Sequence, residues 1–372
     1  MKTARLFKTT LSETQLENSE LNNLECLAGK TVLTSYPRRI VFELTNRCNF
    51  RCIMCGREAT HFKTYDLPVS IISRFEPIYP YVEEVTLHGW GEGTLHPNLF
   101  EILEYLNKYP SLRKYFVTNG STLHKITKAI IDFHVDLVAI SLDGATAETN
   151  NSIRKGGNLK RQLASLSKLI SEKERRNLNY PYINFVFTAM RRNLHELPDM
   201  LKLAHDLGIP EVKVVYLTVF NEGLLHESLV DSQDMVIKVF QEAEELAKEL
   251  QIKLKLPPIQ GSSETGNLRH ESCGLLWRDI YIGSDGFLRS CQSSAKKLAH
   301  VSEYDNFKAL WNSKNMQELR GIVNKDDLMP KQCFYCYHSS CANWNLHHSF
   351  SQIGLDFAPE WEAKEDELAQ RT

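Results

Sequence analysis

The chain has 372 residues, of which 42% are hydrophobic and 24% are charged, and its formal net charge at pH 7 is −2. These values are typical of a globular protein of about two domains. A net charge so close to zero gives no electrostatic basis for binding nucleic acid or a membrane surface, and we expect neither partner. The N-terminus lacks the apolar segment of a signal peptide, and no stretch approaches the ~18 apolar residues of a spanning helix, so we expect a cytoplasmic protein.

Short β-rich segments alternate with helical patterns along most of the chain. After a polar lead-in, for which we expect a helix, six strands are predicted at Arg39–Leu44, Val82–His88, Lys114–Thr118, Leu137–Leu142, Tyr182–Ala189 and Glu211–Leu217. Helices are predicted at Asn98–Lys108, Thr122–Phe133, Arg161–Arg176, Leu194–Leu207 and Asp231–Leu250. This alternation predicts a parallel sheet with crossover helices, either a partial barrel or a doubly wound sheet. In both architectures the functional site lies at the C-terminal ends of the strands.

The domain organisation follows from composition. We expect a lead-in at residues 1–36, the barrel at 37–255, a linker at 256–268, a smaller module at 269–346 and a tail at 347–372. The linker contains two adjacent prolines and a polar stretch. In the smaller module, Trp277–Ile282 and Phe287–Ser290 flank the turn Ser284-Asp285-Gly286, which predicts a β-hairpin.

Eight of the nine cysteines fall in two groups, at residues 48–55 and 273–341, and only Cys26 stands alone. Secreted disulfide frameworks are usually short chains, so we expect the grouped cysteines to bind metal or a cluster in a reducing cytoplasm. Cys26 is interpreted as a buried apolar residue.

The first group, Cys48, Cys52 and Cys55, forms a CxxxCxxC loop directly after the first predicted strand. Three thiolates in such a loop can hold one face of a cubane cluster and leave the fourth iron open to a cofactor or substrate. A zinc knuckle or three free thiols are the alternatives, but structural zinc sites use four ligands.

This loop and the motifs that follow resemble the signature of the radical S-adenosylmethionine (SAM) superfamily. Gly91 and Glu92 in GWGE resemble the motif that binds the amino group of the cofactor, although Gly93 stands where proline is usual. The resemblance implies further contacts with the cofactor. Asn119, Ser141 and Asp143 are expected to contact its ribose or carboxylate, and Arg154 is expected to pair with its carboxylate. The backbone of Met54 is expected to contact its adenine. Strand ends also favour such residues as turn formers, and an arginine there can serve in a surface ion pair.

The second group resembles the C-terminal extension called SPASM or, in its shorter form, twitch. A full SPASM module carries two auxiliary clusters and more cysteines than this chain offers, so the resemblance implies the shorter form with one auxiliary 4Fe–4S cluster. The expected ligands are Cys273, Cys291, Cys333 and Cys336, with Cys341 as a possible substitute. A zinc site in the segment CFYCYHSSC is the alternative.

The resemblance implies a partial (β/α)6 TIM-like barrel with a small C-terminal α+β cluster-binding domain. It also implies that an external one-electron reductant, a flavodoxin or ferredoxin, reduces the 4Fe–4S cluster, and that SAM is cleaved to methionine and a 5′-deoxyadenosyl radical. That radical takes hydrogen from the substrate. We expect an oxidoreductase, a dehydrogenase or epimerase, that acts on a small polar molecule such as a sugar-like or aminocyclitol-like natural-product intermediate.

Two other functions remain open at this stage. One is a ribosomal-peptide maturase whose leader peptide is bound by a separate protein, because the lead-in is too short for a peptide-recognition domain. The other is an iron–sulfur electron carrier without catalysis, which would have no need of Glu92. No residue can be identified as the catalytic base.

Overall fold

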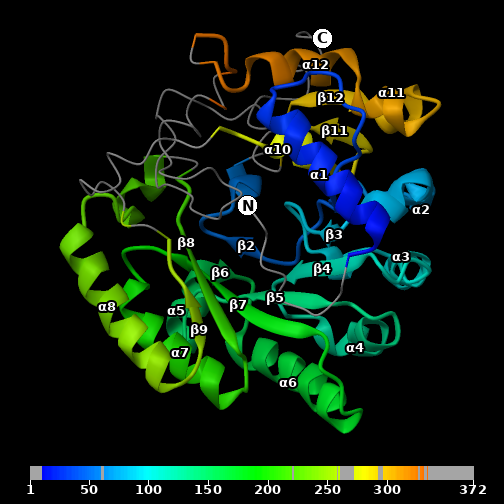
Figure 1. The fold of residues 1–372 in the computed structure, drawn as a ribbon. Helices are drawn as coiled ribbons and strands as arrows, with labels where there is room; N and C mark the ends of the chain where they lie inside the picture. The colour runs from blue at the N-terminus through cyan, green and yellow to red at the C-terminus, as the bar shows by residue number, and fades with distance from the viewer. Residues whose placement is uncertain are drawn as a thin grey trace.

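The computed structural model describes residues 11–59, 63–219, 222–257, 259, 272–291, 296–325, 327–330 and 333. Within them, ten strands form one sheet in the order β12-β11-β10-β1-β3-β4-β5-β7-β8-β9 (Figure 1). These strands are β1 (Arg39–Phe42), β3 (Glu84–Leu87), β4 (Arg113–Thr118), β5 (Leu137–Ser141), β7 (Tyr182–Ala189), β8 (Glu211–Tyr216), β9 (Lys253–Lys255), β10 (Asp279–Ile282), β11 (Phe287–Arg289) and β12 (Lys297–His300).

In this sheet every described pairing from β10 to β9 is parallel, and β10–β11 and β11–β12 are antiparallel. The longer helices are α1 (Glu13–Leu27), α3 (Leu99–Leu106), α4 (Leu123–Asp132), α6 (Leu159–Arg175), α7 (Leu197–Asp206), α8 (Gln233–Glu249) and α12 (Lys314–Ile322). The shorter ones are α2 (Val69–Ser73), α5 (Ala147–Ile153), α10 (Leu275–Arg278) and α11 (Phe307–Trp311). The predicted α/β fold with a partial barrel is confirmed, and no helix within the described ranges is both long and apolar enough to cross a membrane.

Alternation along each strand gives the sheet two different faces. Val85, Phe116 and Phe185 are buried in the main apolar core together with residues of the surrounding helices. Side chains alternate along a strand, so the residues next to them, such as Glu84 and Asn184, belong to the opposite, inner face of the barrel. The outer face therefore stabilises the fold, and the inner face carries the polar groups.

The C-terminal strands continue the barrel sheet, because β10 pairs in parallel with β1. The predicted hairpin is confirmed: β10 and β11 are antiparallel, and the turn contains Gly286 at φ +79°. The prediction of a strand starting at Trp277 is wrong, since Trp277 lies in α10. Its indole is buried and donates to the carbonyl of Lys30 at 2.7 Å, a contact with the lead-in that periodicity does not reveal. The domain boundaries stay a prediction, and most of the expected linker lies outside the described residues.

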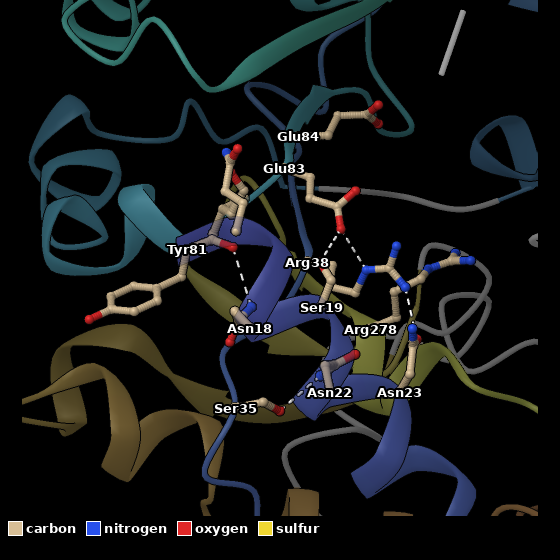
Figure 2. Close-up of polar contacts among 12 residues, drawn as sticks. Asn18, Ser19, Asn22, Asn23, Ser35, Arg38, Tyr81, Glu83, Glu84 and Arg278 are labelled. Carbon is tan, nitrogen blue, oxygen red and sulfur yellow. Dashed lines mark hydrogen bonds and ion pairs between the residues drawn. The ribbon is translucent and has the colours of Figure 1, made fainter. Parts of the chain in front are cut away.

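Helix α1 packs against the fold through polar side chains (Figure 2). Asn18 donates to the carbonyl of Tyr81 at 3.3 Å, and Asn22 donates to the Ser35 hydroxyl at 3.0 Å and to the carbonyl of Trp277 at 2.6 Å. Its leucines are exposed on the other side: Leu16, Leu21, Leu24 and Leu27. Hydrogen bonds to backbone carbonyls therefore fix the position of this helix.

Glu25, near the end of α1, is buried and accepts four hydrogen bonds. The donors are the backbone N–H and hydroxyl groups of Thr34 and Ser35, at 2.6 to 3.0 Å. Burial raises the pKa of Glu25, but these hydrogen bonds outweigh it and hold the pKa at about 2. The carboxylate therefore ties the lead-in to the segment before β1.

We expect Glu25→Gln to lower the free energy of unfolding at pH 7 by about 1–3 kcal/mol, because an amide NH₂ would face backbone and hydroxyl donors. Urea denaturation of the purified protein measures this. The matched control is Glu20→Gln on the exposed side of the same helix, for which we expect a change within about 0.5 kcal/mol. Equal midpoints for the two variants would contradict the role assigned to Glu25.

Candidate active site

The cysteine loop forms part of a small second sheet of two strands. Strand β2 (Arg51–Cys52) is antiparallel to β6 (Arg154–Lys155). The pairing places Cys52 opposite Arg154, which lies about a hundred residues later in the chain. The loop is therefore attached to the segment that follows β5 and α5, where the resemblance locates cofactor contacts.

A close backbone contact joins the start of this loop to the GWGE motif. A Cβ atom on Gly91 would overlap the carbonyl oxygen of Thr45 and would lie only 2.6 Å from that of Arg47. The N–H of Glu92 donates to the Arg47 carbonyl at 2.8 Å. Glycine is required here because the two backbones touch, so the end of β3 determines where the cysteine loop begins.

Glu92 is buried between the ends of β3 and β4. Its carboxylate accepts hydrogen bonds from the N–H and hydroxyl of Thr94 at 3.2 and 2.6 Å, from the Thr118 hydroxyl at 2.7 Å and from the Asn119 N–H at 2.7 Å. Burial raises its pKa, and these hydrogen bonds act in the opposite direction. Its expected contact with the cofactor amino group stays a prediction, and Thr118, which adjoins Asn119, was not identified from the sequence.

Asn119 connects the end of β4 to the cysteine loop. Its side-chain amide donates to Oδ1 of Asn49 at 2.9 Å, and its own Oδ1 accepts from the N–H of Ser121 at 2.9 Å. Ser141, at the end of β5, is partly exposed, and its hydroxyl has no hydrogen-bond partner in the part of the chain that the structure describes. Asn49 was not identified from the sequence either, although it directly follows Cys48.

Asp143 and Arg154 form a buried ion pair, with Oδ2 and Nε 2.7 Å apart. Oδ1 of Asp143 accepts from the N–H of Thr188 at 2.8 Å. Burial raises the pKa of Asp143, and the Arg154 charge opposes that shift. Nη1 of Arg154 lies 4.0 Å from Sγ of Cys52, so this pair directs a positive charge at a cysteine of the loop. The expected cofactor contacts of Asp143 and Arg154 stay predictions.

The three loop cysteines lie together and suit an iron–sulfur cluster. The charge of Cys55 acts on both Cys48 and Cys52, and burial raises the pKa values of both thiols, that of Cys52 to about 12. Such buried thiols ionise only beside cations, which cluster irons supply. Within the described ranges, no three His, Cys, Asp or Glu side chains are placed to hold one metal ion. Three thiols in one loop are the type of donor that iron–sulfur clusters use, and their ligation of a cluster stays a prediction.

Met54 lies beside a second, smaller apolar cluster. This cluster is built from Ile153, Met190, Leu217, Val219 and Leu224. It brings residues after β7 and β8 against the cysteine loop. The backbone contact of Met54 with adenine stays a prediction.

The second cysteine group is described only in part. The N–H of Cys273 donates to Oδ1 of Asn324 at 2.8 Å, Cys291 follows β11, and Cys333 packs against the main core. Cys336 and Cys341 lie outside the described residues, so the auxiliary ligand set stays a prediction. Cys26 is partly buried against the same core, and the described cysteines form no disulfide.

Glu43 connects the GWGE motif to the C-terminal hairpin. One carboxylate oxygen accepts from the N–H of Trp90 at 2.8 Å. The other accepts from the N–H and the hydroxyl of Ser284 at 3.0 and 2.9 Å. Sequence analysis missed this residue, because the partners lie about 50 and 240 positions away.

We expect Gly91→Ala to displace the cysteine loop, since a methyl group would overlap the Thr45 carbonyl. The measurement is the number of irons that the protein retains after anaerobic reconstitution, together with its thermal midpoint. We expect loss of most of the iron bound at this loop and a destabilisation of about 1–3 kcal/mol. Gly93→Ala is the control, because its Cβ would lie 3.2 Å from the edge of the Phe116 ring, which can shift slightly. Normal iron content in Gly91→Ala would contradict this account.

Comparison with known families identifies two matching regions. Residues 42–197 match the family described as the radical SAM superfamily. Residues 273–337 match SPASM, described as an iron–sulfur cluster-binding domain. The first range contains the cysteine loop and the motifs at the ends of β3, β4 and β5, and the second contains four of the five C-terminal cysteines.

Among curated proteins, the chain is similar to the AdoMet-dependent heme synthase of Methanosarcina barkeri, with 29% identity over 60% of this chain and 62% of that protein. It is also similar to the subtilosin biosynthesis protein AlbA of Bacillus subtilis, with 24% identity over 82% of this chain and 67% of AlbA. The matches therefore span about two thirds of the length of these relatives.

Among solved structures, SuiB of Streptococcus suis bound to S-adenosylmethionine is similar, with a TM-score of 0.62, 13% identity, and coverage of 87% of this chain and 76% of SuiB. The structure of anSMEcpe with bound AdoMet has a TM-score of 0.59 at 14% identity and covers 77% of this chain and 84% of that one. At these identities the similarity concerns the fold.

Proposed function

Because the chain belongs to the radical SAM superfamily and carries a SPASM cluster-binding domain, we propose that it cleaves SAM reductively and takes a hydrogen atom from a small polar substrate. The observation that supports this most is the convergence of the cysteine loop with the strand ends. Gly91, Asn119 and Asp143 come from three separate strand ends, and each lies next to the loop or to a residue paired with it.

In the proposed enzyme, Cys48, Cys52 and Cys55 would hold the 4Fe–4S cluster, which would supply the electron for cleavage of SAM to methionine and a 5′-deoxyadenosyl radical. An external flavodoxin or ferredoxin supplies that electron in turn. The Arg154 guanidinium stabilises the thiolate of Cys52. Arg154 and its ion-pair partner Asp143 are both buried, so water is excluded from the ion pair. The chain orients the cofactor with Gly91, Glu92, Asn119 and Ser141, and with the backbone of Met54.

The substrate that we favour is a small, polar molecule, sugar-like or aminocyclitol-like, that undergoes dehydrogenation or epimerisation. The polar inner face of the barrel, with residues such as Glu84 and Asn184, suits such a molecule. An auxiliary cluster on Cys273, Cys291, Cys333 and Cys336 would supply an acceptor for the second electron of an oxidation.

A ribosomal-peptide maturase is the second candidate. It is supported by the similarity to AlbA, a bacteriocin biosynthesis protein that matches 82% of this chain. Turnover of a precursor peptide encoded beside the gene, with no turnover of small polar candidates, would favour this function over the first.

The basic test is release of 5′-deoxyadenosine from SAM under dithionite by the anaerobically reconstituted protein. We expect Cys48→Ala, Cys52→Ala and Cys55→Ala each to abolish release. Cys333→Ala should retain release and stop net turnover of the substrate, because the auxiliary cluster would be lost.

Cys26→Ala is the matched control, since Cys26 belongs to neither cysteine group. It should retain both release and turnover. No release from the fully reconstituted wild type would favour an electron carrier. Normal turnover by Cys333→Ala would contradict the auxiliary-cluster assignment.

A further inference from the structure

We propose that Lys213, on the inner face of β8, binds a carboxylate group of the substrate. This inference rests on the proposed function, because it assumes that a substrate enters the barrel beside the cofactor. It specifies the chemical class of that substrate, namely a molecule with one carboxylate group that lies beside β8.

The strand register places Lys213 in one row with an expected cofactor contact. Ser141 of β5 pairs with Val186 of β7, and Val186 pairs with Lys213 of β8. Neighbouring strands are about 4.8 Å apart, so the backbones of Ser141 and Lys213 are separated by about 10 Å. A molecule of a few carbon atoms can span that distance between the cofactor and the lysine.

Lys213 points into the barrel. Val212 and Val214, its neighbours in sequence, are buried in the core on the outer face, so Lys213 belongs to the inner face. The charge of Arg39 acts on Lys213, although Arg39 lies on β1 and four strands separate β1 from β8 in the sheet. The two side chains can approach only across the barrel interior.

The nearby charges leave Lys213 without a counter-ion. Glu211, two residues before it, is paired with Lys255 at 2.7 Å and with Lys253 at 3.5 Å, and it accepts from the Tyr182 hydroxyl at 3.1 Å. No acidic side chain among the described residues forms an ion pair with Lys213.

The facing strands do not supply an anion either. Asp279 of β10 is paired with Arg39 and Arg278. Glu84 of β3 is paired with Arg113, so both carboxylates are already neutralised.

Asn184 of β7 is 3% exposed, and its Oδ1 has no hydrogen-bond partner in the described part of the chain. Lys213 is a partly buried cation, and Asn184 on the adjacent strand has a buried amide oxygen that lacks a donor. Together they indicate a ligand that offers a carboxylate to Lys213 and a hydroxyl donor to Asn184.

Lys253 and Lys255 share Glu211 and are exposed to solvent, so Lys213 is the one enclosed cation on these described strands that has no ion-pair partner. This favours a carboxylate over a phosphate dianion. Burial lowers the pKa of Lys213 to about 7, with the charges of Lys255 and Arg39 acting in the same direction and Glu211 against them. A bound carboxylate favours the protonated lysine and so raises that pKa. The affinity for the anion is therefore highest below pH 7, where free Lys213 is protonated. It declines about tenfold per pH unit above pH 7 and becomes constant above the pKa of Lys213 in the complex.

The test uses full-length protein whose lysines carry ¹³C-methyl groups, with acetate as the probe and acetamide as its neutral counterpart at constant ionic strength. The Lys213 signal is identified by its loss in Lys213→Met. We expect that signal to titrate near pH 7 and its pKa to rise with acetate but not with acetamide. Lys202, exposed on α7, is the control and should not respond to acetate.

A second measurement remains informative if methylation perturbs the protein. We expect acetate to raise the thermal midpoint of the wild type more than acetamide does, and to have no such advantage in Lys213→Met. Lys213→Arg should retain the acetate effect and lose its decline above pH 7, because arginine stays charged. Equal responses to acetate and acetamide in the wild type would overturn the inference. These measurements need neither SAM nor reductant, so their failure is distinct from failure to release 5′-deoxyadenosine.

Discussion

The backbone contact between Gly91 and the Thr45–Arg47 segment is the interaction on which the rest of the site depends. Parallel strands bring their C-terminal ends to one rim of the barrel, but this does not determine the positions of the loops at that rim. The lack of a side chain at Gly91 lets the end of β3 touch the chain that leaves β1, and the N–H of Glu92 then bonds to Arg47. The three cysteines begin one residue later, so their position follows from this contact.

Buried polar anchors extend this placement around the rim. Glu92 bonds to Thr94 and to the end of β4, Asn119 bonds to Asn49 in the loop, and Asp143 directs Arg154 towards Cys52. Each anchor has its partners inside the protein, because a buried carboxylate or guanidinium without partners would destabilise the fold. The chemistry of the cysteine loop is therefore supported by charges that are fixed before any cofactor binds.

The C-terminal module is built onto the barrel through shared hydrogen bonds. Strand β1 lies between β3 and β10, so one short strand serves both the cysteine loop and the SPASM hairpin. Glu43, just after β1, bonds to Trp90 on one side and to Ser284 on the other. A displacement of the hairpin would therefore act directly on β1 and on the motif beside the cysteine loop. Hydrogen bonds thus connect the cysteine loop to the C-terminal hairpin.

The six barrel strands with the helices between them, the cysteine loop and the hairpin turn could be predicted from the sequence, because each depends on neighbours within a few residues. The short strands β2, β6, β9 and β12 were not predicted. Periodicity located all six predicted barrel strands, and CxxxCxxC with GWGE indicated the family. The partners of Glu43, Asp143 and Lys213 could not be predicted. Which strands become neighbours decides whether a charged side chain lies beside a counter-ion, beside a thiol, or on the inner face without an ion-pair partner. Only the tertiary structure decides that, since burial and charge pairing act through space between residues far apart in the chain.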